Sequence, residues 1–475
     1  MDFTLLPIIP LAILGLNLIF IIILIFFERR DPTSTWAWVL ILALLPLVGF
    51  LLYIFFGLSP RKRRYFQKKQ KHDRDNMITL SGRTFFTPRD NEPENETFEK
   101  NIIKLGLKSR IPSLVGSNKV KIYTHGIDKF ADLFKDLRQA EDFIHINYYM
   151  IKEDWLGREL FNILTHKARE DVEVRLLYDR MGCRNLPDYL FNDLREAGGE
   201  AVQFAPFLID LNYRDHRKNV IIDGQRGYIG GINIGTEYIG ESERFDDWRD
   251  THLRIIGESV DSLQHRFLLD WSFACSKNLL ENDRYFPEKK ETGDARVQII
   301  SSGPDSRSEE IKTMFLRMIY GATESIYIQT PYFIPDESTL EALKVAAETG
   351  VDVRIMVPNR PDHPFVYAAN NSFVGEMLDA GARCFRYEAG FLHSKMMVVD
   401  KKVGTVGTAN MDMRSFRLNF EINAFVYDRE VAEELSEIFH RDQEKSLEVT
   451  PEIYAGRGWN MKFKESLYRL ISPVL

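Results

Sequence analysis

The stretch HRKNVIIDGQRGYIGGINIG, residues 216–235, returns in closely similar form as HSKMMVVDKKVGTVGTANMD, residues 393–412. Each copy holds a histidine, a lysine two positions later and an aspartate five after that: His216, Lys218 and Asp223, then His393, Lys395 and Asp400. A glycine lies 14 and an asparagine 17 positions after each histidine: Gly230 and Asn233, Gly407 and Asn410. The β-branched run behind each lysine is typical of a buried strand. The chain therefore contains one structural unit twice.

The repeat extends beyond these two stretches. Residues 141–151 resemble 324–334, residues 171–179 resemble 351–359, and residues 194–206 resemble 377–388. Each half reads as strands alternating with helices, followed by paired strands, which indicates an α/β sheet. We expect two tandem three-layer α/β/α domains, 119–290 and 291–475, each with a largely parallel sheet. Two such similar halves are expected to pack as a pseudo-dimer with their matching edges together.

The repeated residues favour phosphate chemistry. Side chains at i and i+2 of a strand share a face, so each histidine is expected beside its lysine. Lysine is a donor and a poor metal ligand, which disfavours a metal site and favours an anion such as phosphate. One imidazole can attack phosphorus and form a phosphohistidine. The other can protonate the leaving alkoxide and then deprotonate the incoming hydroxyl. Lys218, Lys395, Asn233 and Asn410 would stabilise charge on the nonbridging oxygens, without metal or cofactor.

Two apolar runs near the N-terminus predict membrane attachment. Leu5–Phe27 and Trp36–Phe56 contain no charged residue and are long enough for transmembrane helices, joined by a short link into a hairpin. The segment 61–74 then holds eight Lys/Arg against one Asp. By the positive-inside rule this places the catalytic domains in the cytoplasm. Residues 61–118 are interpreted as a basic juxtamembrane segment, which attracts anionic lipid, and a connector.

Composition excludes other classes of protein. The formal net charge is −7, and because residues 61–74 carry about +7, the rest of the chain carries −14. A basic nucleic-acid-binding surface is therefore not expected. The three cysteines, Cys183, Cys275 and Cys384, lie far apart, which argues against a disulfide framework or a zinc site. The sequence contains neither a GxxxxGK[ST] loop nor a dinucleotide fingerprint, so no nucleotide cofactor is expected.

The repeated motifs resemble those of a known superfamily. Two copies of HxKx4D resemble the signature of the phospholipase D superfamily, and the second continues as GTANMDMRSFRLNFE, like the family's extension. The whole chain is similar to the bacterial cardiolipin synthases, through ERRDPTSTWAWVL, LNYRDHRK, WRDTHLRI and ESLYRLISPVL. The resemblance implies that Glu421 holds a catalytic histidine by its second ring nitrogen. In the first half Arg244 stands at that offset, and Asp250 is the candidate equivalent. Asp223 and Asp400 would anchor turns rather than touch substrate.

The resemblance also implies an activity. The family joins two phosphatidylglycerol molecules into cardiolipin and releases glycerol, with no nucleotide. His216 is the preferred nucleophile, and His393 would protonate the departing glycerol and then act as base. The expected location is a bacterial inner membrane, as a multi-pass protein whose ligands are phosphatidylglycerol and the anionic membrane. Nothing in the sequence indicates a protein partner.

Several alternatives stay open. Water as acceptor would give a phospholipase D, and another alcohol a different phosphatidyltransferase. A nuclease is disfavoured by the apolar hairpin and the acidic domains, and a noncatalytic scaffold that binds anionic lipid is disfavoured by the complete motifs.

Other aromatic and histidine residues are less specific. Either the cavity or the core is expected to contain Tyr148, Tyr149, Tyr332 and Phe333. Trp459 docks on the membrane or packs on the domain, and His145 and His252 are interpreted as structural.

Overall fold

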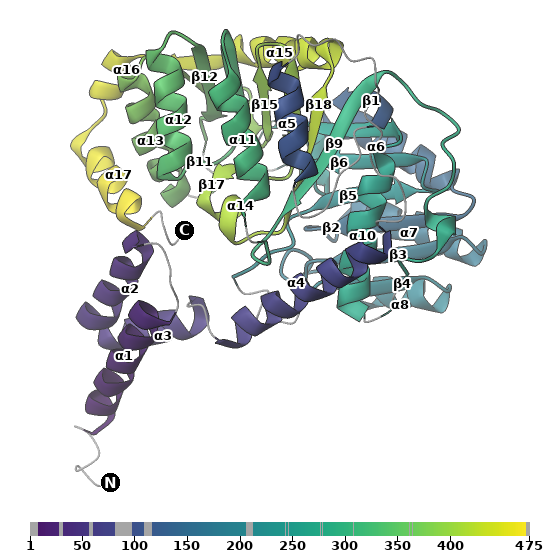
Figure 1. Ribbon diagram of the computed structural model, residues 1–475, viewed down its shortest axis with the longest axis horizontal. Helices are drawn as coiled ribbons and strands as arrows, with labels where there is room; N and C mark the ends of the chain where they lie inside the picture. Colours follow the sequence, from purple (N-terminus) through teal and green to yellow (C-terminus); the bar gives the residue numbers. More distant parts are fainter. Residues whose placement is uncertain are drawn as a thin grey trace.

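The computed structural model describes residues 8–27, 32–56, 60–80, 97–108, 116–205 and 212–471, apart from the single positions 243, 246, 276, 278, 307, 361 and 363. Its centre is one sheet of 15 strands in the order β19-β13-β12-β10-β15-β16-β18-β9-β1-β8-β6-β5-β2-β3-β4. Figure 1 shows this sheet running through both halves of the α/β body, with helices packed along it.

The first half contains the following elements in chain order: β1 (Gly116–Tyr123), α6 (Gly126–Arg138), β2 (Phe143–Tyr148), α7 (Trp155–Arg169), β3 (Glu173–Tyr178), α8 (Asp188–Glu196), β4 (Glu200–Gln203), β5 (Lys218–Ile222), β6 (Arg226–Gly230), η1 (Thr236–Ile239), β7 (Trp248–Arg249), β8 (His252–Gly257) and α10 (Val260–Cys275). Residues of η2 (Asp283–Tyr285) follow and lead to the second half.

The second half repeats this order: β9 (Ala295–Ser302), α11 (Glu310–Gly321), β10 (Ser325–Gln329), β11 (Phe333–Ile334), α12 (Glu337–Glu348), β12 (Asp352–Pro358), α13 (Pro364–Asp379), β13 (Arg383–Tyr387), β14 (Phe391–Leu392), β15 (Met396–Val399), β16 (Val403–Gly407), β17 (Met411–Asp412), α14 (Met413–Arg417), β18 (Glu421–Tyr427), α15 (Arg429–Gln443), β19 (Ser446–Val449), α16 (Pro451–Ala455) and α17 (Trp459–Ile471).

The sheet is mixed, so the expectation of a largely parallel sheet was wrong. Among the described strands of this sheet, the parallel set in each half has three members: β2, β3 and β4 in the first, and β10, β12 and β13 in the second. The strands that follow each HxK motif are antiparallel, as β5 with β6 and β15 with β16. A parallel crossover needs about a dozen residues. Only residues 223–225 separate β5 from β6, so these two strands form a hairpin instead.

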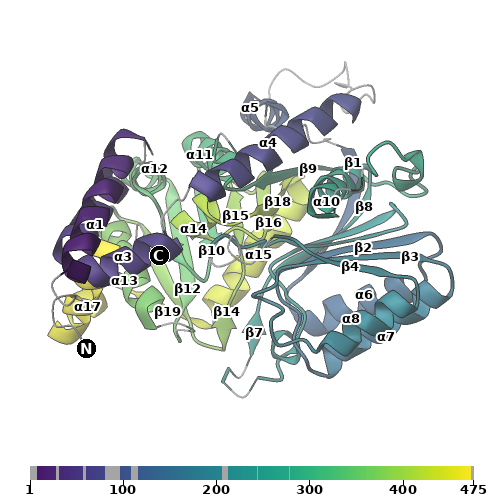
Figure 2. The same cartoon turned by 90° about the horizontal axis from the view of Figure 1, so that it is seen from below.

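The two halves join through their first strands, as the pseudo-dimer prediction requires. β1 pairs antiparallel with β9, which in turn pairs with β18. Strand residues from both halves share one hydrophobic core with α10 and α15 on one face of the sheet. On the other face α6–α8 pack on the first half and α11–α13 on the second, which gives three layers in each half (Figure 2).

The predicted second membrane helix, Trp36–Phe56, is not one helix. It consists of α2 (Pro32–Leu44) and α3 (Pro46–Phe56). The helix breaks because Pro46 has no N–H with which to bond the Leu42 carbonyl four residues earlier. The Asn17 side-chain amide, from α1 (Ile8–Phe26), donates to that carbonyl at 3.1 Å and to the Pro46 carbonyl at 2.9 Å. The Asn17 side chain thus stabilises the break between α2 and α3 by bonding carbonyl groups on both sides of it.

The first predicted membrane segment, Leu5–Phe27, begins in residues outside the described part of the chain. Within the described residues, no helix combines the length and the apolar character needed to cross a membrane. The transmembrane hairpin expected from the sequence is therefore not supported by these helices. Figure 1 shows α1–α3 projecting from the α/β body.

The basic segment after α3 is part of the folded body. It forms α4 (Pro60–Leu80), which packs on α10, and α5 (Thr97–Leu107) follows. Lys69 is fully buried, and its ammonium lies 2.9 Å from both Asp73 and Asp270 and 3.6 Å from Asp305. Burial alone would lower the pKa of Lys69, but Asp270 and Asp73 outweigh it and raise the pKa. Lys69 therefore holds α4 in place and does not face lipid, whereas Lys68 is exposed.

Neighbouring lysines of α4 should differ sharply in their effect on stability. Lys69→Met leaves Asp73 and Asp270 buried with less compensation, so we expect it to reduce the free energy of unfolding by about 3 kcal/mol. Lys68→Met, one position away and exposed, should change it by less than about 0.5 kcal/mol. Thermal unfolding of both variants in detergent measures the difference. Equal unfolding temperatures would show that the ion pairs of Lys69 contribute nothing to the stability of the fold.

Candidate active site

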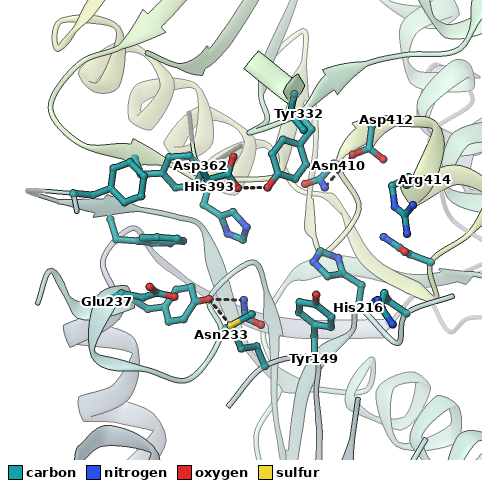
Figure 3. A pocket seen from close by; sticks show the side chains of 18 of the residues that line it. Tyr149, His216, Asn233, Glu237, Tyr332, Asp362, His393, Asn410, Asp412 and Arg414 are labelled. Carbon is teal, nitrogen blue, oxygen red and sulfur yellow. Dashed lines mark hydrogen bonds between the residues drawn. The ribbon is translucent and has the colours of Figure 1, made fainter. Parts of the chain in front are cut away.

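Both repeated histidines face one cavity between the halves. The cavity has a volume of about 470 Å³, and its walls include His216, His393, Asn233 and Asn410. The imidazoles point into it from the two halves, as Figure 3 shows. The two histidine side chains are only 12% and 10% exposed. The structure thus brings together the histidines and asparagines that sequence analysis singled out.

The lysines lie beneath the histidines. Lys218 opens β5, and its ammonium donates to the carbonyl of His216 at 2.7 Å. Lys395 stands just before β15 and donates to the carbonyl of His393 in the same way. Both lysines are buried, at 0% and 2% exposure. Each HxK motif therefore places a cation directly behind its own imidazole.

Each histidine is held by a carboxylate from the other half. His216 Nδ1 lies 3.0 Å from both carboxylate oxygens of Glu421. His393 Nδ1 lies 2.7 Å from Asp250 Oδ2. Glu421 and Asp250 are the residues to which the family resemblance assigns this role. A carboxylate on Nδ1 fixes the ring orientation and tautomer, and leaves Nε2 for chemistry in the cavity.

Burial sets the protonation of these groups. It lowers the pKa of His393 to about 4, with Lys395 adding to the effect and Asp250 opposing it. It also lowers the pKa of His216, against the opposing charge of Glu421. Both imidazoles are therefore neutral at pH 7, and one can act as a nucleophile. Burial likewise lowers the pKa of Lys218 to about 7 and of Lys395 to about 8. A phosphodiester anion bound here would favour the charged form of each group.

The motif aspartates lie outside the cavity. Asp223 accepts hydrogen bonds from the backbone N–H groups of residues 141–143 at 2.8–3.0 Å. Asp400 does the same for residues 323–325 at 2.8–2.9 Å. Both adopt a left-handed backbone conformation with φ of 51°. Each aspartate thus closes the turn after its HxK strand onto the start of the neighbouring strand.

A buried chain of ion pairs supports His216 from behind. The guanidinium of Arg217 lies 2.8 Å from Asp270 on α10, and its Nε donates to the Glu421 carbonyl at 3.3 Å. Asp270 also pairs with Arg266 at 2.6 Å and with Lys69 of α4 at 2.9 Å. The backbone of both His216 and its carboxylate partner is therefore tied to α10 and, through it, to α4.

Several residues of the cavity wall were not predicted from the sequence. Of the four aromatic residues left open, Tyr149 and Tyr332 line the cavity, whereas Tyr148 and Phe333 are core. The wall also includes residues that were not expected there: Arg214, Glu237, Arg244, Trp248, Asp362, Phe391, Asp412 and Arg414. The repeat gave no signal for Arg214, because Phe391 stands at its offset in the second half. His145, bonded to Gln264 and Glu173, and the buried His252 do not line the cavity.

Comparison with known proteins gives the family. The family described as cardiolipin synthase, PLD-like domain, matches residues 133–245 and 315–443. The family described as phospholipase D-nuclease N-terminal matches residues 15–57. A cardiolipin synthase of Staphylococcus aureus strain Mu50 is 46% identical over 470 residues, which cover 97% of this chain and 95% of the relative. One of Oceanobacillus iheyensis is 45% identical over 468 residues, or 97% of each chain.

Among solved structures, the phosphatidylserine synthase of Haemophilus influenzae aligns with this chain at a TM-score of 0.61 and 16% sequence identity. The alignment covers 80% of this chain and 99% of that one, which shows that the two share a fold. Two tandem α/β units with paired HxK motifs define the phospholipase D superfamily. Within it, this chain belongs to the cardiolipin synthase family.

Removing either cross-half carboxylate should reduce turnover more than binding. Glu421→Gln and Asp250→Asn keep the size of the side chain but lose its charge, so His216 or His393 loses its fixed tautomer. We expect kcat to fall about 10²- to 10⁴-fold, with KM nearly unchanged because the lysines remain. Steady-state kinetics on a phospholipid substrate gives both constants.

The matched control for this pair is Glu341→Gln, an exposed carboxylate that pairs with Lys344 on the surface. This variant should behave as the unmodified enzyme. A change confined to KM in Glu421→Gln and Asp250→Asn would contradict the proposed orientation of the imidazoles.

Proposed function

We propose that this enzyme joins two phosphatidylglycerol molecules into cardiolipin and releases glycerol. The observation that carries the proposal is the facing pair of neutral imidazoles, each held by a buried carboxylate of the opposite half, at one cavity. Two histidines that face one cavity from opposite halves suit a reaction in which one carries the phosphoryl group and the other moves a proton. The family relatives that match nearly the full length are named cardiolipin synthases.

In the proposed first step, Nε2 of His216 attacks the phosphorus of one phosphatidylglycerol. A phosphorus–nitrogen bond forms and the bond to the glycerol oxygen breaks. His393, which takes up a proton on Nε2 from solvent when the phosphodiester anion binds, gives that proton to the departing oxygen. Lys218 and Lys395 stabilise the charge on the nonbridging oxygens. Asn233 and Asn410 are not assigned this predicted role, because their amide nitrogens already donate to Tyr238 and Asp412.

In the second step a hydroxyl of another phosphatidylglycerol gives its proton to His393 and attacks the phosphorus. The phosphorus–nitrogen bond breaks, and His216 is restored. One phosphodiester replaces another, so no nucleotide energy input is needed. Asp223 and Asp400 take no part in either step and hold the motif turns.

The products of the purified enzyme test this proposal. In vesicles of labelled phosphatidylglycerol, with chelator and without nucleotide, we expect cardiolipin and glycerol in equal amounts. His216→Ala and His393→Ala should each abolish both products, since each removes one of the two imidazoles. Phosphatidic acid in place of cardiolipin would identify a hydrolase, and normal cardiolipin from either variant would refute the two-histidine mechanism.

We also propose that α1–α3 embed in the bacterial inner membrane as a multi-pass hairpin, with the α/β body on the cytoplasmic side. Within the described part of the chain, these helices expose large apolar side chains: Leu14, Leu18, Ile19, Ile22, Ile25, Phe26, Trp36, Leu40, Leu44, Leu47, Val48 and Leu51. Apolar patches of this extent favour a lipid environment. Exposed basic residues of α4, among them Arg64, Lys68 and Lys71, suit the anionic lipids of the inner leaflet.

Labelling of an introduced cysteine tests the location. In intact cells a membrane-impermeant maleimide should not reach Arg64→Cys, and it should react after the cells are opened. The parent chain measures the background from Cys183, Cys275 and Cys384, of which two are buried. Labelling of Arg64→Cys from outside would place the body on the other side. Extraction of the full chain by alkaline carbonate would show that α1–α3 do not embed.

A further inference from the structure

The cavity has two chemically different ends. Arg414 lies at the end beside His216, while Glu237 and Asp362 lie at the end beside His393 (Figure 3). Tyr332 donates its hydroxyl hydrogen to a carboxylate oxygen of Asp362. The mechanism above uses the centre of the cavity and leaves the function of the carboxylate end open.

The carboxylate end offers hydrogen-bond acceptors. Carboxylate oxygens such as those of Glu237 and Asp362 are hydrogen-bond acceptors. Asn233 and Asn410 line the same cavity and are 3% and 4% exposed. Their amide nitrogens donate to Tyr238 and Asp412, whereas both amide oxygens are buried and, among the described residues, have no hydrogen-bond partner. A buried acceptor without a donor is costly, so these oxygens indicate a ligand that brings hydroxyl groups.

Two basic side chains offset the negative charge of this end. Lys152 lies 2.6 Å from Glu237. Arg244 donates to the backbone carbonyl of Asp362 at 2.8 Å and thereby joins the two halves over the cavity. An uncharged ligand with several hydroxyls therefore fits this end better than a cation does.

The direction of the reaction brings such a ligand here. The attacking nitrogen of His216 and the departing oxygen lie on opposite sides of the phosphorus, so the departing glycerol extends past His393. The incoming hydroxyl must arrive from the same side. Glycerol leaves in the first step and the glycerol headgroup of the second lipid enters in the next, so one set of acceptors serves both.

We propose that Asp362, Glu237 and Tyr332, with the amide oxygens of Asn233 and Asn410, form a polyol subsite that binds the hydroxyls of the glycerol headgroup. This inference rests on the proposed function and assigns its acceptor specificity. An acceptor without a second hydroxyl leaves buried acceptors unpaired, and water leaves more of them unpaired. The buried rings of Trp248 and Phe391 on the same wall further limit the room for water. The subsite thus favours transfer to a polyol over hydrolysis and over transfer to a simple alcohol.

The test is a competition between two alcohols on the full-length enzyme in mixed micelles. The donor is phosphatidyl-4-nitrophenol, whose coloured leaving group reports the first step and makes no use of the polyol subsite. Glycerol and 1-propanol are present at equal concentration. The amounts of phosphatidylglycerol, phosphatidylpropanol and phosphatidic acid report the choice of acceptor in the second step.

We expect the unmodified enzyme to prefer glycerol to 1-propanol by about tenfold or more, the effect of one to two well-made hydrogen bonds. Asp362→Asn and Glu237→Gln should each reduce that preference about tenfold, while the burst of nitrophenolate stays within about twofold. Tyr332→Phe removes the donor that orients Asp362 and should give an intermediate loss. Glu433→Gln, an exposed carboxylate paired with Arg429 on α15, is the matched control and should keep the full preference.

Either of two results would overturn the subsite: no preference for glycerol in the unmodified enzyme, or an unchanged preference in folded Asp362→Asn and Glu237→Gln. If one variant fails to fold, the other and the unmodified enzyme still decide the matter. Preference for free glycerol together with no cardiolipin from phosphatidylglycerol alone would support the subsite and refute the proposed function. Cardiolipin synthesis from phosphatidylglycerol without a preference for glycerol over 1-propanol would support the proposed function and refute the polyol subsite.

Discussion

The pairing of each histidine with a carboxylate from the opposite half is the constraint on which the rest of the structure depends. Neither half contains a complete acid–base pair, because Glu421 serves His216 and Asp250 serves His393. The sheet must therefore continue from one half to the other. It does so through β1, β9 and β18, and the shared core beneath α10 and α15 draws on strands of both halves. Folding and assembly of the site are thus one event.

That constraint also explains why so much charge is buried. Two lysines and two carboxylates lie within the interface between the halves, at 2% exposure or less. Desolvation of this many charges costs more than their pairing returns unless further contacts compensate. The lowered pKa values of Lys218 and Lys395 show that Glu421 and Asp250 do not fully offset the burial of these two lysines. A phosphodiester anion supplies further negative charge, so the burial that disfavours the ammonium groups favours the binding of an anionic substrate.

The repeat predicted the residues that it marks twice, and the family resemblance added Glu421 and Asp250. The two α/β units, their edge-to-edge packing and the His, Lys and Asn positions follow from matching offsets in the two halves. Glu237 and Asp362 have no such counterpart, and no local pattern separates them from surface carboxylates. Lys69 was counted with the basic run because its partner Asp270 lies about 200 positions away and only the fold brings them together. The break at Pro46 was missed because the run Trp36–Phe56 was interpreted by its length and apolar character alone, although the proline in it is a helix-breaking signal.

The burial of Lys69 changes what the N-terminal segment does. The sequence predicts a juxtamembrane segment and connector over residues 61–118, whereas Pro60–Leu80 form α4, which packs on α10. α4 is held by Lys69 and Asp73 to Arg266 and Asp270, and Asp270 in turn holds Arg217 beside His216. The position of α4 and the orientation of the His216 imidazole thus depend on one buried network. In the membrane arrangement proposed above, the helix that follows α1–α3 in the chain is therefore part of the support of the catalytic cavity.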